Sequence, residues 1–176
     1  DSYVFYLKKA IHAAARFDNL LWMASGLNNL GYKYIELQQY DSALASLERA
    51  QRVLPLHDQS DSLFLGSIAD NMAIVYEKKG LTQEALRLYG ENYNRFKNTI
   101  DVGRFLHAGN AQIRLFTRLG KHADAGKLLK EMLAFAANNE GKLPENILDE
   151  LMHAELEFAW ATGNDFRAVQ ISELLR

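Results

Sequence analysis

Apolar residues recur every three or four positions along most of this chain, and short polar breaks interrupt them. The pattern is clearest over residues 27–55. Two stripes with helical spacing lie there: Leu27, Leu30, Gly31 and Tyr34 before a polar break, and Ala43, Leu47 and Ala50 after it. This spacing predicts one helix on each side of the break. We expect the two helices to fold back on each other, with small residues allowing close approach and Pro55 ending the second helix.

A turn residue followed five positions later by an alanine occurs in four places. The pairs are Gln38 and Ala43, Gly80 and Ala85, Gly120 and Ala125, and Gly163 and Ala168. Glycine is favoured just past a helix because it adopts the left-handed backbone conformation without strain. The alanines follow one another at intervals of 42, 40 and 43 residues. The helix pair is therefore predicted to repeat.

The complete pattern predicts an all-α fold of about nine helices in one domain, residues 1–176. We expect residues 1–17 to be the second helix of an incomplete repeat, followed by four repeats at 20–55, 62–97, 100–138 and 144–176. Asp41 is expected to cap a helix, residues 56–62 to form a loop before a helix from Leu63, and Pro144 to open the last repeat. The aromatic residues expected in the core are Tyr34, Tyr76, Tyr89, Phe96, Phe116 and Phe135.

The stretch over residues 27–55 resembles a tetratricopeptide repeat (TPR). The residues that match the family signature in order and spacing are Leu27, Leu30, Gly31, Tyr34, Ala43, Leu47, Ala50 and Pro55. The period exceeds the roughly 34 residues of the standard repeat, and it resembles the lengthened repeats of kinesin light chains and of bacterial regulatory TPR proteins. The resemblance implies a right-handed α-solenoid of antiparallel helix pairs, a TPR-like superhelix whose first helices line a concave face.

This resemblance weakens toward the C-terminus. Polar Gln112 and Glu155 stand where the first copy has Leu30, and branched apolar residues stand where it has Gly31. Helix packing in the last two copies is therefore expected to differ from that in the first.

Composition and charge remove several classes of function. The chain has 176 residues, 48% of them apolar, a net charge of -2 and no cysteine. Because its charges are scattered rather than gathered on a basic face, we expect no nucleic-acid partner. No apolar run is long enough to span a membrane and no leader precedes the first helix, so we expect no membrane insertion. We expect a cytoplasmic location, with a periplasmic or other extracytoplasmic one left open, and a piece of a longer protein, since the chain opens on Asp1.

Candidate chemistry is sparse. The five histidines lack the i, i+4 and HExxH patterns of zinc helices, and no strand precedes any glycine as a phosphate-binding loop requires. His153, Glu155 and Glu157 could form an acid/base group, but carboxylates on a helix surface are usually solvated. We expect no metal, no cofactor and no enzymatic activity.

The family resemblance implies that a partner binds along the concave face. The residues expected to point toward that groove or its rim are Asn28, Asn29, Tyr32, Glu36, Asp70, Asn71, Ile74, Lys78, His107, Asn110, Arg114, Arg118, His153 and Glu157. Asn29 and Asn71 share a repeat position where the family often has a peptide-binding Asn, and a role in bridging neighbouring helices is an equal alternative. Arg114 and Arg118 could hold a carboxylate or phosphate, or form a solvated basic face.

The leading hypothesis is a non-catalytic protein- or peptide-binding scaffold, the repeat region of a bacterial regulatory or signalling protein. Its partner would be a protein or peptide segment, with an acidic group as one option, and self-association is left open. The alternative is a sensor domain that binds an anionic metabolite near Arg114 and Arg118. A third hypothesis is an accessory part of an enzyme whose catalytic domain lies outside this chain.

Overall fold

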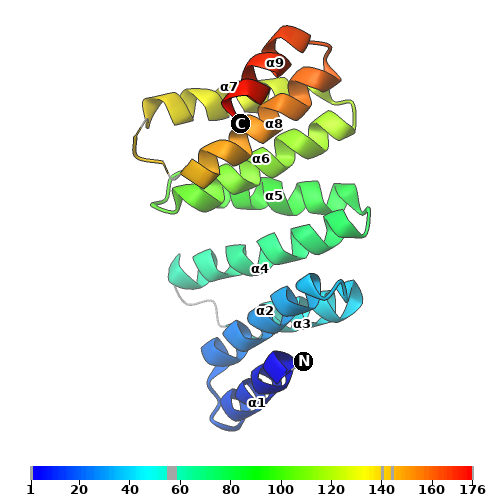
Figure 1. The fold of residues 1–176 in the computed structure, drawn as a ribbon. Helices are drawn as coiled ribbons and strands as arrows, with labels where there is room; N and C mark the ends of the chain where they lie inside the picture. The colour runs from blue at the N-terminus through cyan, green and yellow to red at the C-terminus, as the bar shows by residue number, and fades with distance from the viewer. Residues whose placement is uncertain (1, 55–58, 140, 144, 176) are drawn as a thin grey trace. The chain divides into compact units, whose positions relative to one another are not determined.

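The computed structural model describes residues 2–54, 59–139, 141–143 and 145–175 (Figure 1). The predictions for Pro55 and Pro144 lie outside the described residues. The described ranges form nine α-helices and no strand. The helices are α1 (Ser2–Arg16), α2 (Leu20–Glu36), α3 (Tyr40–Val53), α4 (Gln59–Lys78), α5 (Thr82–Phe96), α6 (Val102–Arg118), α7 (His122–Asn138), α8 (Glu145–Ala161) and α9 (Asp165–Leu174). Within the same ranges, no helix combines the length and apolar character needed to cross a bilayer.

The turn residues predicted from the sequence have the expected backbone conformation. Gly80, Gly120 and Gly163 have φ of 74°, 70° and 72°, and Gln38 has φ of 57°. The left-handed conformation reverses the chain so that two consecutive helices can pack side by side. Asp18, with φ of 50°, forms a fifth turn of this kind between α1 and α2. This turn falls in the break between residues 17 and 20 that the sequence predicted.

Two helix starts differ from the sequence prediction. Helix α4 begins at Gln59 rather than at Leu63, because the polar residues that precede the apolar stripe are themselves suited to a helix's first turn. Asp41 does not cap α3. The capping position belongs to Gln39, which makes no side-chain capping hydrogen bond, and Asp41 lies in the first turn, where a carboxylate still interacts favourably with the helix dipole.

Side-chain caps do begin three other helices in the described chain. Asn19 accepts a hydrogen bond from the backbone amide of Trp22 at 3.1 Å at the start of α2. Asp101 and Asn164 do the same at the starts of α6 and α9. Each cap satisfies an amide that has no partner within its helix, which typically contributes about 1 kcal/mol.

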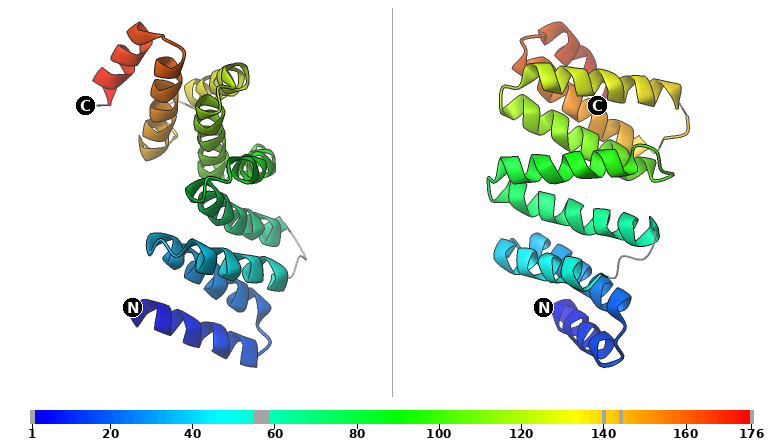
Figure 2. Two further views of the ribbon diagram at one scale, coloured as in Figure 1. Left: turned by 90° about the vertical axis from the view of Figure 1, so that its right-hand side faces the viewer. Right: turned by 180° about the vertical axis from the view of Figure 1, so that it is seen from behind.

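The chain divides into two compact units, Asp1–Leu88 and Tyr89–Arg176, with the division inside α5. Figure 2 shows the helices of each unit from two further sides. In the first unit α2 packs on α1, α3 and α4. In the second unit α6 and α8 pack on each other and on α7, and α8 also packs on α9. The predicted repeat bounds and the single domain stay predictions.

Each unit has its own set of buried side chains. Fully buried large hydrophobic residues in the first unit are Leu47, Ile68 and Val75, and in the second unit they are Tyr89, Phe96, Leu106, Ile113, Met132 and Ile171. Of the six aromatic residues expected in the core, Tyr89 and Phe96 are buried. The other four, Tyr34, Tyr76, Phe116 and Phe135, are half-buried.

Close contact within two of the helix pairs depends on glycine. A Cβ atom on Gly31 of α2 would lie 2.6 Å from Cγ of Leu47 and 3.3 Å from the backbone oxygen of Ala43, both on α3. In the second unit Gly109 of α6 has this role, and a Cβ there would lie 2.7 Å from Sδ of Met132 on α7. Gly109 lies about one helical turn farther from its turn residue than Gly31 does from its own. This difference confirms that helix packing in the later copy differs from that in the first.

Polar residues at the altered positions find partners within the second unit. The side-chain amide of Gln112 donates to the backbone oxygens of Ala108, at 3.3 Å, and Tyr89, at 3.4 Å. Glu155 is buried and accepts from Nε of Arg167 at 2.7 Å. Buried polar groups are tolerated when they are hydrogen-bonded in this way.

Gly31→Ala is predicted to destabilise the protein by about 1 to 3 kcal/mol, because the added methyl group would overlap Leu47. The measurement is the midpoint of urea unfolding. Gly90→Ala is the matched control, since Gly90 also lies inside a helix but a Cβ there would meet only Oε1 of Gln112, at 3.5 Å. The control should be neutral or stabilised by up to about 1 kcal/mol. Equal midpoints for the two variants would contradict the close-contact interpretation.

Candidate functional site

Three of the predicted partner-binding residues line one hollow on α2. Asn29, Tyr32 and Glu36 are exposed, and they surround an open space of about 440 Å³ together with Tyr3 of α1 and Lys33 of α2. The carboxylate of Glu36 accepts a hydrogen bond from Nζ of Lys33 at 3.0 Å. The spacing i, i+3 and i+7 places the three residues on one side of the helix.

The hollow continues along the contact between α1 and α2. A second open space of about 520 Å³ shares Asn29 with the first, and we refer to the two together as the α1–α2 trough. The remaining residues that line it are Leu7, Ala10, Ala13, Ala14, Phe17, Asn19, Trp22, Ser25 and Gly26. Phe17 and Trp22 are 82% and 71% exposed. Exposed apolar patches of this kind mark interaction sites more often than scattered surface residues do.

Asn28 and Asn71 differ from the expectation that they point into a groove. Asn28 is buried, and its side-chain oxygen accepts a hydrogen bond from the amide nitrogen of Asn71 at 2.9 Å. This bond joins α2 to α4. Asn71 therefore has the bridging contact that the sequence left as an alternative, while Asn29, at the equivalent repeat position, faces the trough.

The other predicted partner-binding residues of α4 differ in how exposed they are to solvent. Asp70 and Ile74 are half-buried, and Lys78 is exposed. None of the three lines the α1–α2 trough.

The basic stripe predicted on α6 lies against acidic residues of α8. Nε and a terminal nitrogen of Arg118 donate to the two carboxylate oxygens of Glu157 at 2.7 and 3.4 Å. Nδ1 of His107 lies 3.3 Å from a carboxylate oxygen of Glu150. The hydrogen bond with His107 lowers the pKa of the Glu150 carboxyl below its ordinary value of 4.5, and the charge of Arg114 adds to this effect. We call these contacts the α6–α8 charge ladder.

Asn110 of α6 and His153 of α8 were also predicted to face a partner. Asn110, expected in the groove, is fully buried, and neither polar atom of its side chain has a hydrogen-bond partner among the described residues. His153 is exposed on α8.

An anionic ligand at Arg118 would have to displace the carboxylate of Glu157, so the arrangement favours a structural role for this arginine over ligand binding.

The described residues offer little support for catalytic chemistry on α8. Of the suggested acid/base group, Glu155 is held by Arg167 and Glu157 by Arg118. No three His, Asp or Glu side chains gather within the described ranges where they could hold a metal ion.

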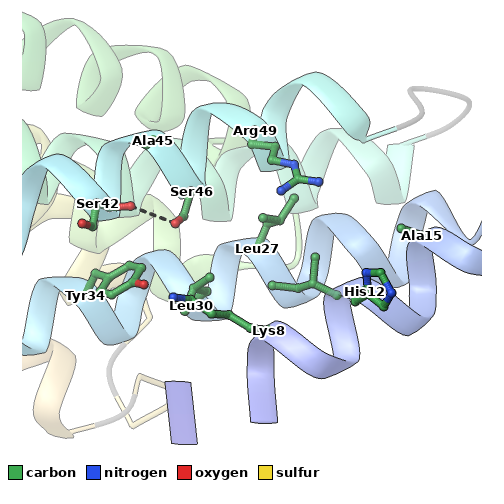
Figure 3. A pocket seen from close by; sticks show the side chains of 11 residues that line it. Lys8, His12, Ala15, Leu27, Leu30, Tyr34, Ser42, Ala45, Ser46 and Arg49 are labelled. Carbon is green, nitrogen blue, oxygen red and sulfur yellow. Dashed lines mark hydrogen bonds between the residues drawn. The ribbon is translucent and has the colours of Figure 1, made fainter. Parts of the chain in front are cut away.

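Sequence reasoning missed a third open space, which lies between α1 and α3 on a floor formed by α2 (Figure 3). It measures about 540 Å³, and we call it the α1–α3 groove. Its lining residues are Lys8, Ile11, His12, Ala15, Leu27, Leu30, Tyr34, Ser42, Ala45, Ser46 and Arg49. No pattern in the sequence paired Lys8 and His12 of α1 with Arg49 of α3.

No family model matches this chain, and no curated protein matches its sequence. Among the crystal structures that share its fold are the nearly identical TPR-like repeats of a protein from Podosopora anserina assigned as a kinesin light chain, and a single-substitution variant of the same repeats. Both are 18% identical to this chain and cover 98% of it and 83% of their own length. The TM-scores are 0.75 and, for the variant, 0.80. The chain therefore has a TPR-like helical-repeat fold, as its sequence predicted.

Arg118→Glu is predicted to lower the free energy of unfolding slightly, by about 0.2 to 1 kcal/mol, because the pair with Glu157 is partly exposed. The double change Arg118→Glu with Glu157→Arg should recover most of the loss. The measurement is a double-mutant cycle from urea unfolding. If the single change leaves stability unaltered, the arginine is not part of a structural ladder.

Glu150→Gln is predicted to make stability less dependent on pH. Because the folded-state pKa of Glu150 is depressed, its contribution is fully present above about 4.5, the unfolded value, and is lost as pH falls through the folded value. The variant should therefore melt below the wild type at pH 7, and the gap should close in acid. Asp149→Asn, an exposed neighbour, controls for the loss of charge. A gap that is equal at all pH values would contradict this assignment.

Proposed function

We propose that this chain is a non-catalytic scaffold that binds a segment of another protein, and that it is the repeat region of a bacterial regulatory or signalling protein. The TPR-like fold supports the scaffold role, because stacked helix pairs present extended surfaces to partners. The bacterial and regulatory parts of the proposal rest on the resemblance of the repeat length alone.

The observation that carries the proposal is the shape of the α1–α2 trough. Small residues form its middle, namely Ala10, Ala13, Ala14, Ser25 and Gly26. Aromatic residues stand at its ends, with Tyr3 and Tyr32 at one end and Phe17 and Trp22 at the other. A low floor between bulky ends lets the backbone of another helix come close while the aromatic rings cover it.

The dimensions of the trough fit a helical segment. Its α1 side runs from Tyr3 to Phe17, which is about 20 Å at 1.5 Å per residue. An amphipathic helix of about four turns would place apolar residues at i, i+4 and i+7 along such a groove. Asn29, where the two hollows meet, can both donate and accept a hydrogen bond and would fix the register of the bound segment.

The metabolite-sensor alternative is less favoured. In that alternative, Arg114 and Arg118 would bind the metabolite, but carboxylates of the α6–α8 charge ladder already lie beside both arginines.

A tryptophan readout tests the proposal directly, because the chain has two tryptophans and one of them lies in the trough. Segments of about 14 residues, the length of a four-turn helix, are selected from a displayed random library. In a Trp160→Phe background, a bound segment should shift the emission of Trp22 to shorter wavelength, since apolar side chains would cover its ring. Trp22→Ala should weaken binding at least about tenfold, as expected of an exposed aromatic side chain that a partner covers.

Trp160→Ala is the matched control, because Trp160 is 61% exposed and lies outside the trough. It should leave the affinity unchanged. Selected segments that bind Trp22→Ala as tightly as the wild type would count against the trough. If calorimetry detects heat from a metabolite panel and none from any segment, the scaffold proposal itself fails.

A further inference from the structure

The α1–α3 groove lies on the side of α2 away from the α1–α2 trough. Leu27, Leu30 and Tyr34 face the groove, while Asn29 and Tyr32 face the trough. At 100° per residue, these two sets point to nearly opposite sides of one helix. The groove is therefore a separate surface, and its occupant does not depend on what the trough binds.

The floor of the groove is apolar and well buried. Ile11 of α1 and Leu27 and Leu30 of α2 are 6%, 2% and 5% exposed. Each still contributes to the lining of the open space. A partner that inserts one or two apolar side chains would remove the remaining apolar surface from water, which stabilises a complex in proportion to the area covered.

Basic side chains stand on both walls. Lys8 and His12 extend from α1, and Arg49 extends from α3 toward the α2 floor (Figure 3). Nζ of Lys8 lies 5.9 Å from the ring centre of Tyr34, and no carboxylate within the described residues pairs with Lys8 or Arg49. None of the described residues that line the groove is acidic.

This arrangement contrasts with the other basic surface of the chain. In the α6–α8 charge ladder, Arg118 and His107 each contact a carboxylate. The side chains of Lys8 and Arg49 keep their hydrogen-bonding capacity for a group that is not part of the described chain. A guanidinium and an ammonium on opposite walls can each hold one carboxylate.

The length of the groove indicates the kind of partner. It extends from Lys8 to Ala15 on α1 and from Ser42 to Arg49 on α3, or about 10 Å along each helix. That distance matches three residues of an extended chain or two turns of a helix. We propose that the α1–α3 groove binds an acidic amphipathic protein segment, with apolar side chains on the α2 floor and carboxylates held by Lys8 and Arg49.

The test compares two double variants that remove the same charge from the same helices. Lys8→Gln with Arg49→Gln alters the groove. Lys9→Gln with Arg52→Gln is the matched control, since neither Lys9 nor Arg52 lines the groove. Segments are selected from the displayed random library on the Trp22→Ala protein, which suppresses trough binders, and their affinities are measured by fluorescence anisotropy.

The following results would support the groove proposal. The selected segments should be rich in both acidic and apolar residues, and the groove variant should weaken their binding at least about tenfold, as for hydrogen bonds to charged groups. The control variant should bind like its parent. Binding should also weaken as NaCl is raised from about 50 to about 500 mM, because salt screens the charge contacts. Ala45→Trp, which fills the groove from an exposed position, should block binding without any change of charge.

Other results would overturn the proposal. It fails if no segment is recovered, if the segments lack acidic residues, or if both double variants bind alike. It also fails if sodium succinate alone binds more tightly than the segments do, since the site would then be one for small anions. If the groove proposal fails in one of these ways while the wild-type protein still binds the trough segments, only the groove proposal has failed and the proposed function stands.

Discussion

Close contact between consecutive helices is the constraint on which each unit of this protein depends. Because Gly31 has no side chain, α2 approaches α3 so closely that Leu47 fills the space where a Cβ atom of residue 31 would lie. Gly109 lets α6 approach α7 in the same way. The turn between each pair must place the helices for this contact, and left-handed residues such as Gln38 and Gly120 do so. Because the turn determines which two helices pack together, each helix pair presents one surface on each of its two sides.

The surfaces that result differ in how their charges are used. On α6, His107 and Arg118 contact carboxylates of α8, so these pairs help to hold two helices of one unit together. On α1 and α3 the basic residues line an open groove with an apolar floor and have no such partner among the described residues. The same residue types therefore serve different purposes, and the neighbouring helix decides which. A cation with a carboxylate beside it contributes little to binding, whereas one that is unpaired above apolar surface can select an acidic partner.

The sequence was a good guide to the helices and a weaker guide to the exposed surfaces. Helical spacing and the glycine turns predicted the pairs correctly, because both are local properties of the backbone. The predicted groove residues were chosen by counting along single helices, and this method placed Asn29 and Tyr32 on an open surface. It failed for Asn28 and Asn110, which are buried. Counting gives the direction of a side chain, but it does not show whether another helix covers that direction.

The sequence by itself determined the fold class, the turn positions and the change of packing in the later copy, since these follow from periodicity, backbone preference and side-chain size. Only the tertiary structure showed that Asn71 bonds to Asn28, that Glu157 engages Arg118, and that Lys8 and Arg49 line one groove. In each case the two residues are distant along the chain and come from different helices. Whether their side chains meet depends on the distance and rotation between those helices, which no pattern within a single helix records.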